Sequence, residues 1–522
     1  ADRAMEHGMK NTPVREIMKA GEVVITPTDS IFALEQVIVD SGWGQIPVIQ
    51  DNSLIGIVTR TDLIKHWART HPSPAALPAT TMITPDQVRE ILGKPTAALI
   101  DAIADHGQGA RINLYMVGGV VRDLLLHRPN FDLDFVVETD AIEFARSIQQ
   151  VYGGEISTHP AFRTAKWRLN EQCAAKLGVD LTALPLYIDF ATARNEFYEH
   201  PTALPTVYAG SIKLDLQRRD FTINTLAVQL SPASSVGRVL DFYNGLDDLQ
   251  QKTIRVIHSL SFVDDPTRIL RAVRFAQRLD FTIEPRTADL ITTSREMLRR
   301  ITGERVRNEL TLLLNEAEPE RGLLELNQRG ALAAIHPALR FDVSMAADFV
   351  RLRDPALLMQ SPLPVSEFDR SDSYWHIWLC QLPPTEVITT GERLLISKFE
   401  RDSLQAAAKL LENADKLENA PHVTPSLVVT LLEGIPDIAL WAVWLVSKNK
   451  LMQEYIYRYL TTWQHIRPVT TGHTLKALGL LPGPRYRLIL ERLRTARLDG
   501  EVETDEQETA LLQTLIAGDL SR

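Results

Sequence analysis

Two aspartates separated by one residue, Asp132 and Asp134, constrain this chain more than any other feature. They lie in an apolar, strand-like run with Phe131, Phe135 and Val136 around them. Because side chains alternate between the two faces of a strand, we expect both carboxylates on one face, close together. Neighbouring carboxylates repel each other unless one takes up a proton or a divalent cation bridges them. The spacing therefore predicts a metal site on a strand. An exposed acidic strand edge with the same sequence pattern is the alternative.

A glycine pair, Gly118 and Gly119, precedes these acids, between a short apolar strand and the start of a helix. Without Cβ atoms, such a turn lets the backbone approach a phosphate closely, and the start of the helix adds N–H donors. Metal-bound carboxylates beside such a turn suit an in-line displacement at a nucleoside triphosphate, with Mg²⁺ as the cofactor.

Length and composition limit the remaining possibilities. The chain has 522 residues, 45% of them hydrophobic and 23% charged, which predicts several folded domains and little disorder. The two cysteines, Cys173 and Cys380, are far apart, which argues against a disulfide framework or zinc site and favours the cytoplasm. No apolar run has a membrane span's length, so we expect no membrane partner. With a net charge of −10, any contact with nucleic acid must use local basic patches.

The N-terminal segment, residues 1–69, resembles a CBS domain through the motifs IPVI (46–49) and GIVTRTD (56–62). In that family the Thr and Asp of the second motif hold an adenine nucleotide, which here implies Thr59 and Asp62. A unit that only spaces or dimerises, and binds nothing, is the alternative. CBS units normally occur in pairs, so we expect a partner unit upstream of Ala1, in a longer protein, and a dimer through CBS units.

The rest of the chain divides by its pattern. A linker rich in Pro (70–84) leads to a region of alternating strands and helices (85–235). Beyond it, helical spacing continues almost to the end, through a neck (236–325), a body (326–415) and a tail (416–522).

One helix of the neck carries a row of arginines, Arg268, Arg271, Arg274 and Arg278, three or four residues apart. This spacing places them on one face of a helix, and the other faces are apolar. Unpaired guanidinium groups in such a stripe suit a triphosphate or an RNA backbone. A salt-bridged surface helix is the alternative.

The Gly-Gly turn followed by Asp-x-Asp resembles the DNA polymerase β nucleotidyltransferase superfamily. That superfamily often has a third catalytic carboxylate on a neighbouring strand, for which Asp189 is the candidate beside Asp132 and Asp134. Four further segments, in this order, resemble class II tRNA nucleotidyltransferases, which include CCA-adding and A-adding enzymes, and bacterial poly(A) polymerases. These segments are IKLDLQRRDFTINTLAV (212–228), DFYNGLDDLQQKTIRVI (241–257), DDPTRILRAVRFAQRLDF (264–281) and GERVRNEL (303–310).

The resemblance implies a polymerase β-like α/β head followed by an all-α neck, body and tail, with the small α/β CBS unit in front. It implies that Asp265 and Arg268, expected on one helix face, read the base, and that the motif starts with Asp264 where the family usually has Glu. Asp132 and Asp134 would be the metal ligands. The nucleotide-binding residues expected from the motifs and the arginine row are Gly118, Gly119, Arg122, Arg219, Asp220, Asn224, Asp265, Arg268, Arg271 and Arg274.

The expected substrates are CTP or ATP, and the expected partner is the acceptor stem and 3′ end of tRNA. The segment between Asp189 and Arg218 falls where the family has a flexible loop; it looks full length, which favours addition of A. A Gly-rich turn (482–484) before a basic helix resembles the tail of long bacterial CCA-adding enzymes, although a plain capping turn would look the same. A poly(A) polymerase and an adenylate-sensing CBS protein with an inactive head remain alternatives.

Overall fold

The computed structural model describes residue 13 and residues 23–41, 43–60, 62–63, 66, 81–197, 206–414 and 423–518. The chain divides into two compact units, one formed by residues 1–268 and 282–290 and the other by residues 269–281 and 291–522. The predicted neck (236–325) is therefore shared between the two units. The predicted linker (70–84) lies mostly outside the described residues.

The N-terminal part contains helix α2 (Ile31–Ser41) and a hairpin of β1 (Gln45–Gln50) and β2 (Ser53–Thr59). The turn residues Asp51 and Asn52 both adopt positive φ angles, 48° and 63°, as the commonest two-residue hairpin turn requires. The turn residues Asp51-Asn52-Ser53 between two β-branched runs predict a hairpin from the sequence alone, and the structure confirms it.

A mixed sheet forms the centre of the first unit, and seven described strands belong to it in the order β11-β10-β3-β4-β7-β6-β5. Strands β4 and β7 run parallel, and the other neighbours run antiparallel. Just before helix α4 (Pro85–Gly109), Met82 forms a β-bridge with Arg238, so residues 81–83 adjoin the edge strand β11. The strands are β3 (Leu114–Val117), β4 (Leu133–Val137), β5 (Glu155–His159), β6 (Thr164–Arg168), β7 (Tyr187–Thr192), β10 (Ala227–Ser231) and β11 (Val239–Leu240).

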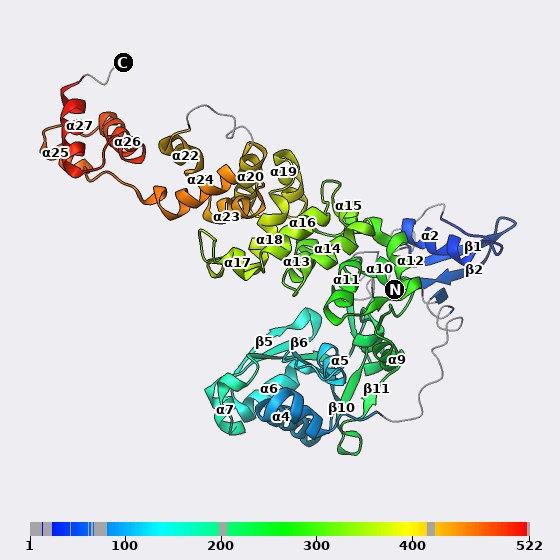
Figure 1. Ribbon diagram of the computed structural model, residues 1–522. Helices are drawn as coiled ribbons and strands as arrows, with labels where there is room; N and C mark the ends of the chain where they lie inside the picture. The colour runs from blue at the N-terminus through cyan, green and yellow to red at the C-terminus, as the bar shows by residue number, and fades with distance from the viewer. Residues whose placement is uncertain are drawn as a thin grey trace. The chain divides into compact units, whose positions relative to one another are not determined.

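The two faces of this sheet have different chemistry. One face carries Phe135, Phe190 and Trp167, which pack with Phe144 of α6 (Ala141–Tyr152). In Figure 1, α6 lies on the same side of the sheet as α4 (Pro85–Gly109) and α7 (Glu171–Leu177). On the opposite face, Val136 packs into an apolar cluster with residues of α8 (Ile212–Gln217). Alternation along β4 therefore puts the acidic positions on the α8 face.

Further short elements lie in the first unit or cross from it into the second. Hairpin β8–β9 directly follows β7, and it is the base of the predicted flexible loop, of which residues 198–205 lie outside the described residues. Helix α11 begins in the first unit at Thr267 and continues into the second. The elements are α5 (Gly119–Leu125), β8 (Arg194–Phe197), β9 (Thr206–Ala209), α9 (Gly245–Gln250), β12 (Thr253–Ile254), α10 (Ser261–Asp264), α11 (Thr267–Leu279), β13 (Thr282–Ile283) and α12 (Pro285–Ser294).

The second unit is helical, as predicted, and its described residues contain no strand. Edge-to-face packing of Phe341 against Phe349 and Trp378 forms part of its core. Toward the C-terminus, α25, α26 and α27 share a smaller core around Leu475 and Leu493. The main helices are α13 (Gly303–Leu314), α14 (Pro319–Gln328), α15 (Ala331–Ile335), α16 (Val343–Arg351), α17 (Pro355–Leu358), α18 (Arg370–Leu379), α19 (Pro384–Arg393), α20 (Lys398–Glu412), α22 (Pro425–Leu432), α23 (Asp437–Val446), α24 (Lys450–Thr461), α25 (Gly472–Ala477), α26 (Pro484–Leu498) and α27 (Asp505–Ala517).

Within the described ranges, no single helix has the length and apolar character of a membrane span. One pair, α22 and α23, meets that criterion by length and composition only when the two are taken together, across a bend of 114°.

Candidate active site

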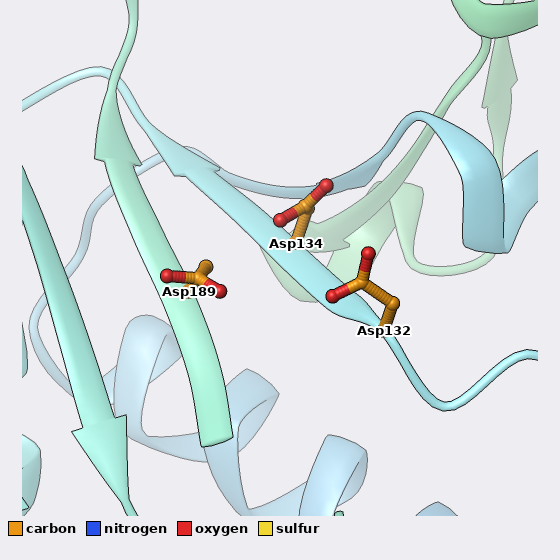
Figure 2. A group of neighbouring side chains, drawn as sticks. All are labelled: Asp132, Asp134 and Asp189. Carbon is orange, nitrogen blue, oxygen red and sulfur yellow. The ribbon is translucent and has the colours of Figure 1, made fainter. Parts of the chain in front are cut away.

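Three aspartates meet on the α8 face of the sheet. Asp134 on β4 lies directly opposite Asp189 on the parallel strand β7, and Asp132 immediately precedes β4. One carboxylate oxygen from each lies within 4.8 Å of the others, and Figure 2 shows the three groups around a common space. The structure thus brings together the predicted pair and the candidate third acid.

The surroundings of this cluster oppose ionisation of its central member. Burial raises the pKa of Asp134 to about 6, and the charges of Asp132 and Asp189 act in the same direction. Arg219 and Lys166 act against this rise in pKa. Lys166 lies opposite Asp189 on β6, and its Nζ is 3.1 Å from Oδ2 of Asp189. Lys166 carries no signal in the sequence that points to this site, because only the pairing of β6 with β7 brings it to the acids.

The donor set fits a hard divalent cation. Every ligand atom of the cluster is a carboxylate oxygen, the type that Mg²⁺ and Ca²⁺ prefer, and no cysteine or histidine is part of it among the described residues. A bound cation would also offset the repulsion that raises the pKa of Asp134.

The Gly-Gly turn lies directly beside the acids. Gly118 has a positive φ of 76° and precedes α5. A Cβ atom at this position would lie 2.7 Å from Nη1 of Arg219 and 3.8 Å from Oδ2 of Asp134. The positive φ favours glycine at this position, and a Cβ there would displace the Arg219 guanidinium from the turn.

Arg122, expected at the triphosphate, has an internal position instead. Its side chain is 2% exposed, and its Nε and Nη2 donate to the two carboxylate oxygens of Asp123, each at 2.7 Å. Its Nη1 donates to Oδ1 of Asn224 at 2.8 Å. Asn224 in turn donates to Oδ1 of Asp220 at 3.0 Å. Arg122 therefore orients the predicted Asp220–Asn224 segment, and Asp123, which the sequence analysis missed, fixes Arg122.

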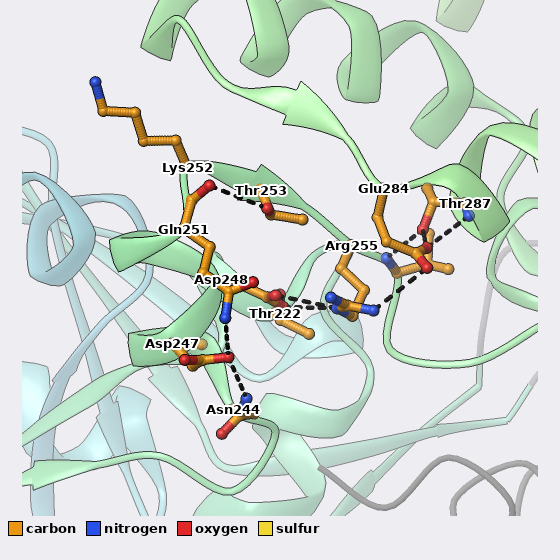
Figure 3. Close-up of polar contacts among 12 residues, drawn as sticks. Thr222, Asn244, Asp247, Asp248, Gln251, Lys252, Thr253, Arg255, Glu284 and Thr287 are labelled. Atoms are coloured by element: carbon orange, nitrogen blue, oxygen red, sulfur yellow. Dashed lines mark hydrogen bonds and ion pairs between the residues drawn. The ribbon is translucent and has the colours of Figure 1, made fainter. Parts of the chain in front are cut away.

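A second polar network also contacts the segment 220–224, through Thr222 (Figure 3). Thr222 donates to Oδ2 of Asp248 at 2.6 Å, and Arg255 donates to both oxygens of Asp248 at 3.0 Å. Arg255 also pairs with Glu284 at 3.4 Å, and Glu284 accepts from the backbone N–H of Thr287. Motif residues between 241 and 257 thus hold the turn that carries the predicted nucleotide contacts.

The base-reading pair is close together, but not on one helix face as predicted. Asp265 has extended angles (φ −141°, ψ 96°) and lies between α10 and α11. The cause is Pro266, because a proline disfavours helical angles in the residue before it. The carboxylate of Asp265 accepts from the N–H and Oγ1 of Thr267 at 3.1 and 2.6 Å. Arg268, 6% exposed, donates to Oγ of Ser261 at 2.7 Å.

The other arginines of α11 differ in their surroundings. Arg274 is buried and pairs with Glu309 at 3.3 Å and Glu316 at 3.5 Å. The expectation of unpaired guanidinium groups is therefore wrong for Arg274, because α13 and the residues after it supply acids that the helical spacing of α11 could not reveal. Arg271 is half-buried, and Arg278 is exposed.

Two further predicted sites have mixed outcomes. Thr59 Oγ1 and its backbone N–H donate to Oδ2 of Asp62 at 2.7 and 2.9 Å, so the CBS pair is adjacent, and its nucleotide contact stays a prediction. In the tail, the arginines around the Gly-rich turn have partners within the second unit, such as Arg497 with Glu508 and Arg494 with Glu433. In the described part of the tail, these arginines of the basic helix are therefore paired with acids.

Comparison with known proteins agrees with this geometry. Residues 114–255 match the family model "Poly A polymerase head domain", residues 280–342 match "Probable RNA and SrmB- binding site of polymerase A", and residues 14–69 match "CBS domain".

Three relatives illustrate the similarity of the whole chain. An A-adding tRNA nucleotidyltransferase of Geobacter sulfurreducens is 34% identical over 97% of this chain, which spans only 58% of that relative's length. One of Halalkalibacterium halodurans is 31% identical over 81% of this chain and 93% of its own. The structure of a Thermotoga maritima CCA-adding enzyme complexed with tRNA superposes with a TM-score of 0.62 at 29% identity, covering 82% of this chain and 98% of the other.

Proposed function

Because this chain belongs to the tRNA nucleotidyltransferase family and carries a CBS domain, we propose that it adds nucleotides from CTP or ATP to the 3′ end of tRNA. We include the terminal A in this proposal. Both curated relatives named above are A-adding enzymes. The segment between Asp189 and Arg218 resembles the full-length flexible loop of the family.

The observation that carries the proposal is the cluster of Asp132, Asp134 and Asp189 beside Gly118 and Arg219. It places an acidic cation site next to a turn that lacks a Cβ atom and next to a guanidinium group. These are the parts that a nucleotidyl transfer needs: metal ligands, access for a triphosphate, and a positive charge to accompany it.

In the reaction, the 3′-hydroxyl oxygen of the tRNA forms a bond to the α-phosphorus, and the bond to pyrophosphate breaks. Divalent cations, for which we propose Mg²⁺, supply activation of the hydroxyl and neutralisation of the triphosphate when bound. Asp132, Asp134 and Asp189 would hold them. Arg219 contributes positive charge next to Gly118, where the triphosphate can approach the backbone.

Base selection is assigned to the protein because no template strand is needed in this family. Asp265 can accept a hydrogen bond from the amino group of C or A, and Arg268 can donate to the ring nitrogen beside it. Among the described residues, Ser261 and one backbone carbonyl accept from two of the five N–H groups of Arg268, which leaves donors for the base.

Contact with tRNA is proposed for the helical tail (416–522), where Arg487 in α26 has a side chain that is 82% exposed. The match of residues 280–342 to an RNA-binding model supports a further RNA contact. A dimer through CBS units and a cytoplasmic location stay predictions; two buried free thiols agree with the latter.

The decisive experiment supplies tRNA transcripts that end before the first C, after the second C, and after the terminal A, with CTP and ATP offered separately. An A-adding enzyme extends only the transcript that ends in CC, and only with ATP. A CCA-adding enzyme also extends the shortest transcript with CTP. Repeated A addition to an unstructured RNA primer would identify a poly(A) polymerase instead, and no metal-dependent incorporation on any primer would remove the enzymatic proposal.

A further inference from the structure

We propose that Asp215 positions both halves of the nucleotide site, the triphosphate side through Arg219 and the base-reading side through Arg218. The proposal rests on the function proposed above. It concerns a residue that contacts neither the acid cluster nor the base-reading pair directly, so it is a positioning residue and not a catalytic one.

Asp215 is a fully buried carboxylate held between two consecutive arginines. Its side chain is 0% exposed, whereas those of Arg218 and Arg219 are each 18% exposed. Its Oδ1 accepts from Nε and Nη2 of Arg218 at 3.1 and 2.8 Å, and its Oδ2 accepts from Nη2 of Arg219 at 3.3 Å. A buried carboxylate is tolerated only with such partners, so the position of Asp215 is tied to those of both arginines.

The first connection leads to the triphosphate side. Nη1 of Arg219 lies so close to Gly118 that a Cβ there would be 2.7 Å away. The bond from Nη2 to Asp215 is the side-chain hydrogen bond found for Arg219 among the described residues, and its buried Nε has no partner there. Asp215 therefore decides where the Arg219 guanidinium lies relative to the Gly-Gly turn.

The second connection leads to the base-reading side. The backbone carbonyl of Arg218 accepts from Nη2 of Arg268 at 2.6 Å. Because the Arg218 side chain is bound to Asp215, the position of this carbonyl depends on Asp215 as well. One carboxylate thus connects the arginine at the triphosphate turn with the arginine that reads the base.

The test compares Asp215→Asn with Asp348→Asn. Asp348 is a matched control, since it is also buried and pairs with an arginine three residues later, at 3.2 Å from Arg351, but lies in α16 of the second unit. Steady-state kinetics with all four nucleotides on the tRNA primer that wild type extends would give KM, kcat and selectivity for each variant.

We expect Asp215→Asn to lower kcat/KM for the preferred nucleotide about ten- to hundredfold, mainly through KM, because misplacement of a positioning group has effects of this size. Selectivity against UTP and GTP should fall in the same variant. Asp348→Asn should keep KM and selectivity within about threefold of wild type. Equal behaviour of the two variants would overturn the proposal.

A double-mutant comparison with Arg219→Gln separates positioning from a general structural role. If Asp215 acts through Arg219, Asp215→Asn adds little to the KM of a protein that already lacks Arg219. If the two losses multiply instead, the connection to the triphosphate side is wrong.

Arg218→Met covers the case in which Asp215→Asn does not fold, as judged by circular dichroism. It keeps the Asp215–Arg219 pair and releases only residue 218, so we expect lower selectivity with the KM of the preferred nucleotide within about threefold. Unchanged selectivity would overturn the connection to Arg268. Should wild type add no nucleotide to any tRNA, equilibrium binding of CTP, ATP, UTP and GTP to the same variants in Ca²⁺ tests this proposal while the function fails separately.

Discussion

The spacing of residues predicts both the acid pair on β4 and the arginine row on α11. The structure agrees with the first prediction more fully than with the second. Alternation along β4 puts Asp134 on one face of the sheet, as the Asp-x-Asp spacing predicts, and the pairing of β4 with β7 brings Asp189, expected from the family resemblance, opposite it. On α11, the spacing puts arginines in one row, but Arg274 is bound to two glutamates and Asp265 lies before the helix. Strand spacing determines the face of a side chain, and the sheet determines what lies opposite. Helix spacing leaves the opposing surface unspecified.

The largest effect is therefore expected at the acids. Asp132→Ala or Asp134→Ala should abolish nucleotide addition while circular dichroism and melting show a folded protein, because a repelling carboxylate is removed together with a metal ligand. The measurement is incorporation of labelled nucleotide into tRNA. An active Asp132→Ala variant would contradict the assignment of Asp132 as a metal ligand.

A graded effect is expected at the start of α11. Asp265→Ala should weaken discrimination against UTP and GTP by about 1–3 kcal/mol, the usual range for one bidentate base contact. Triphosphate binding should change less, since Arg219 lies elsewhere. The comparison of kcat/KM for the four nucleotides measures this, and full selectivity in the variant would mean that another group reads the base.

The acids should also respond to pH. The folded-state pKa of Asp134, about 6, lies above the ordinary value of 3.8, so the protonated form contributes stability at low pH that is lost as pH rises through 6. Metal-free Asp134→Asn should therefore be more stable than wild type by about 3 kcal/mol at pH 7.5, and the two should converge near pH 4. Chemical denaturation at both pH values tests this. Cation affinity of wild type, measured by calorimetry, should fall below pH 6.

Substitutions at the two inner arginines of α11, Arg271 and Arg274, should have different effects on stability and on KM. Arg274→Gln removes a partner of Glu309 and Glu316 and should lower the free energy of unfolding by about 1–3 kcal/mol with little change in KM. Arg271→Gln should raise the KM for nucleotide with a smaller loss of stability. If Arg274→Gln raised the KM and left stability unchanged, the guanidinium would serve the nucleotide after all.

The smallest effect is expected from a change that leaves both the acid cluster and helix α11 intact. Deleting residues through Ala79 removes the CBS segment but keeps Thr81, whose carbonyl accepts from the N–H of Val239 in the head sheet. Turnover should stay within about threefold of wild type. Loss of activity in a folded deletion variant would show that the CBS segment contributes to the chemistry.

Much of this fold could be predicted from the sequence, and the exceptions have identifiable causes. The hairpin at Asp51, the Gly-Gly turn and the acid pair were predicted, because each depends on neighbours in the chain. Lys166, Asp123 and Asp215 were not assigned any role. Lys166 reaches Asp189 only through sheet pairing, which local spacing does not report. Asp123 and Asp215 lie within four residues of their arginine partners, but the burial that gives these pairs their role depends on tertiary packing. Arg122 was recognised as important, but its burial against Asp123 and Asn224 depends on the packing of segments far apart in sequence.

The parallel pairing of β4 with β7 has a consequence for how this protein can vary. The segment between the two strands holds the helices α6 and α7 and the antiparallel pair β5–β6. Its length can change without moving Asp189 away from Asp134, provided that β7 still enters the sheet in the same register. A single inserted or deleted residue within β7 is different, since it would turn Asp189 to the aromatic side and bring Phe190 to the acids. Relatives and engineered versions should therefore tolerate insertions between the strands and reject them inside either strand.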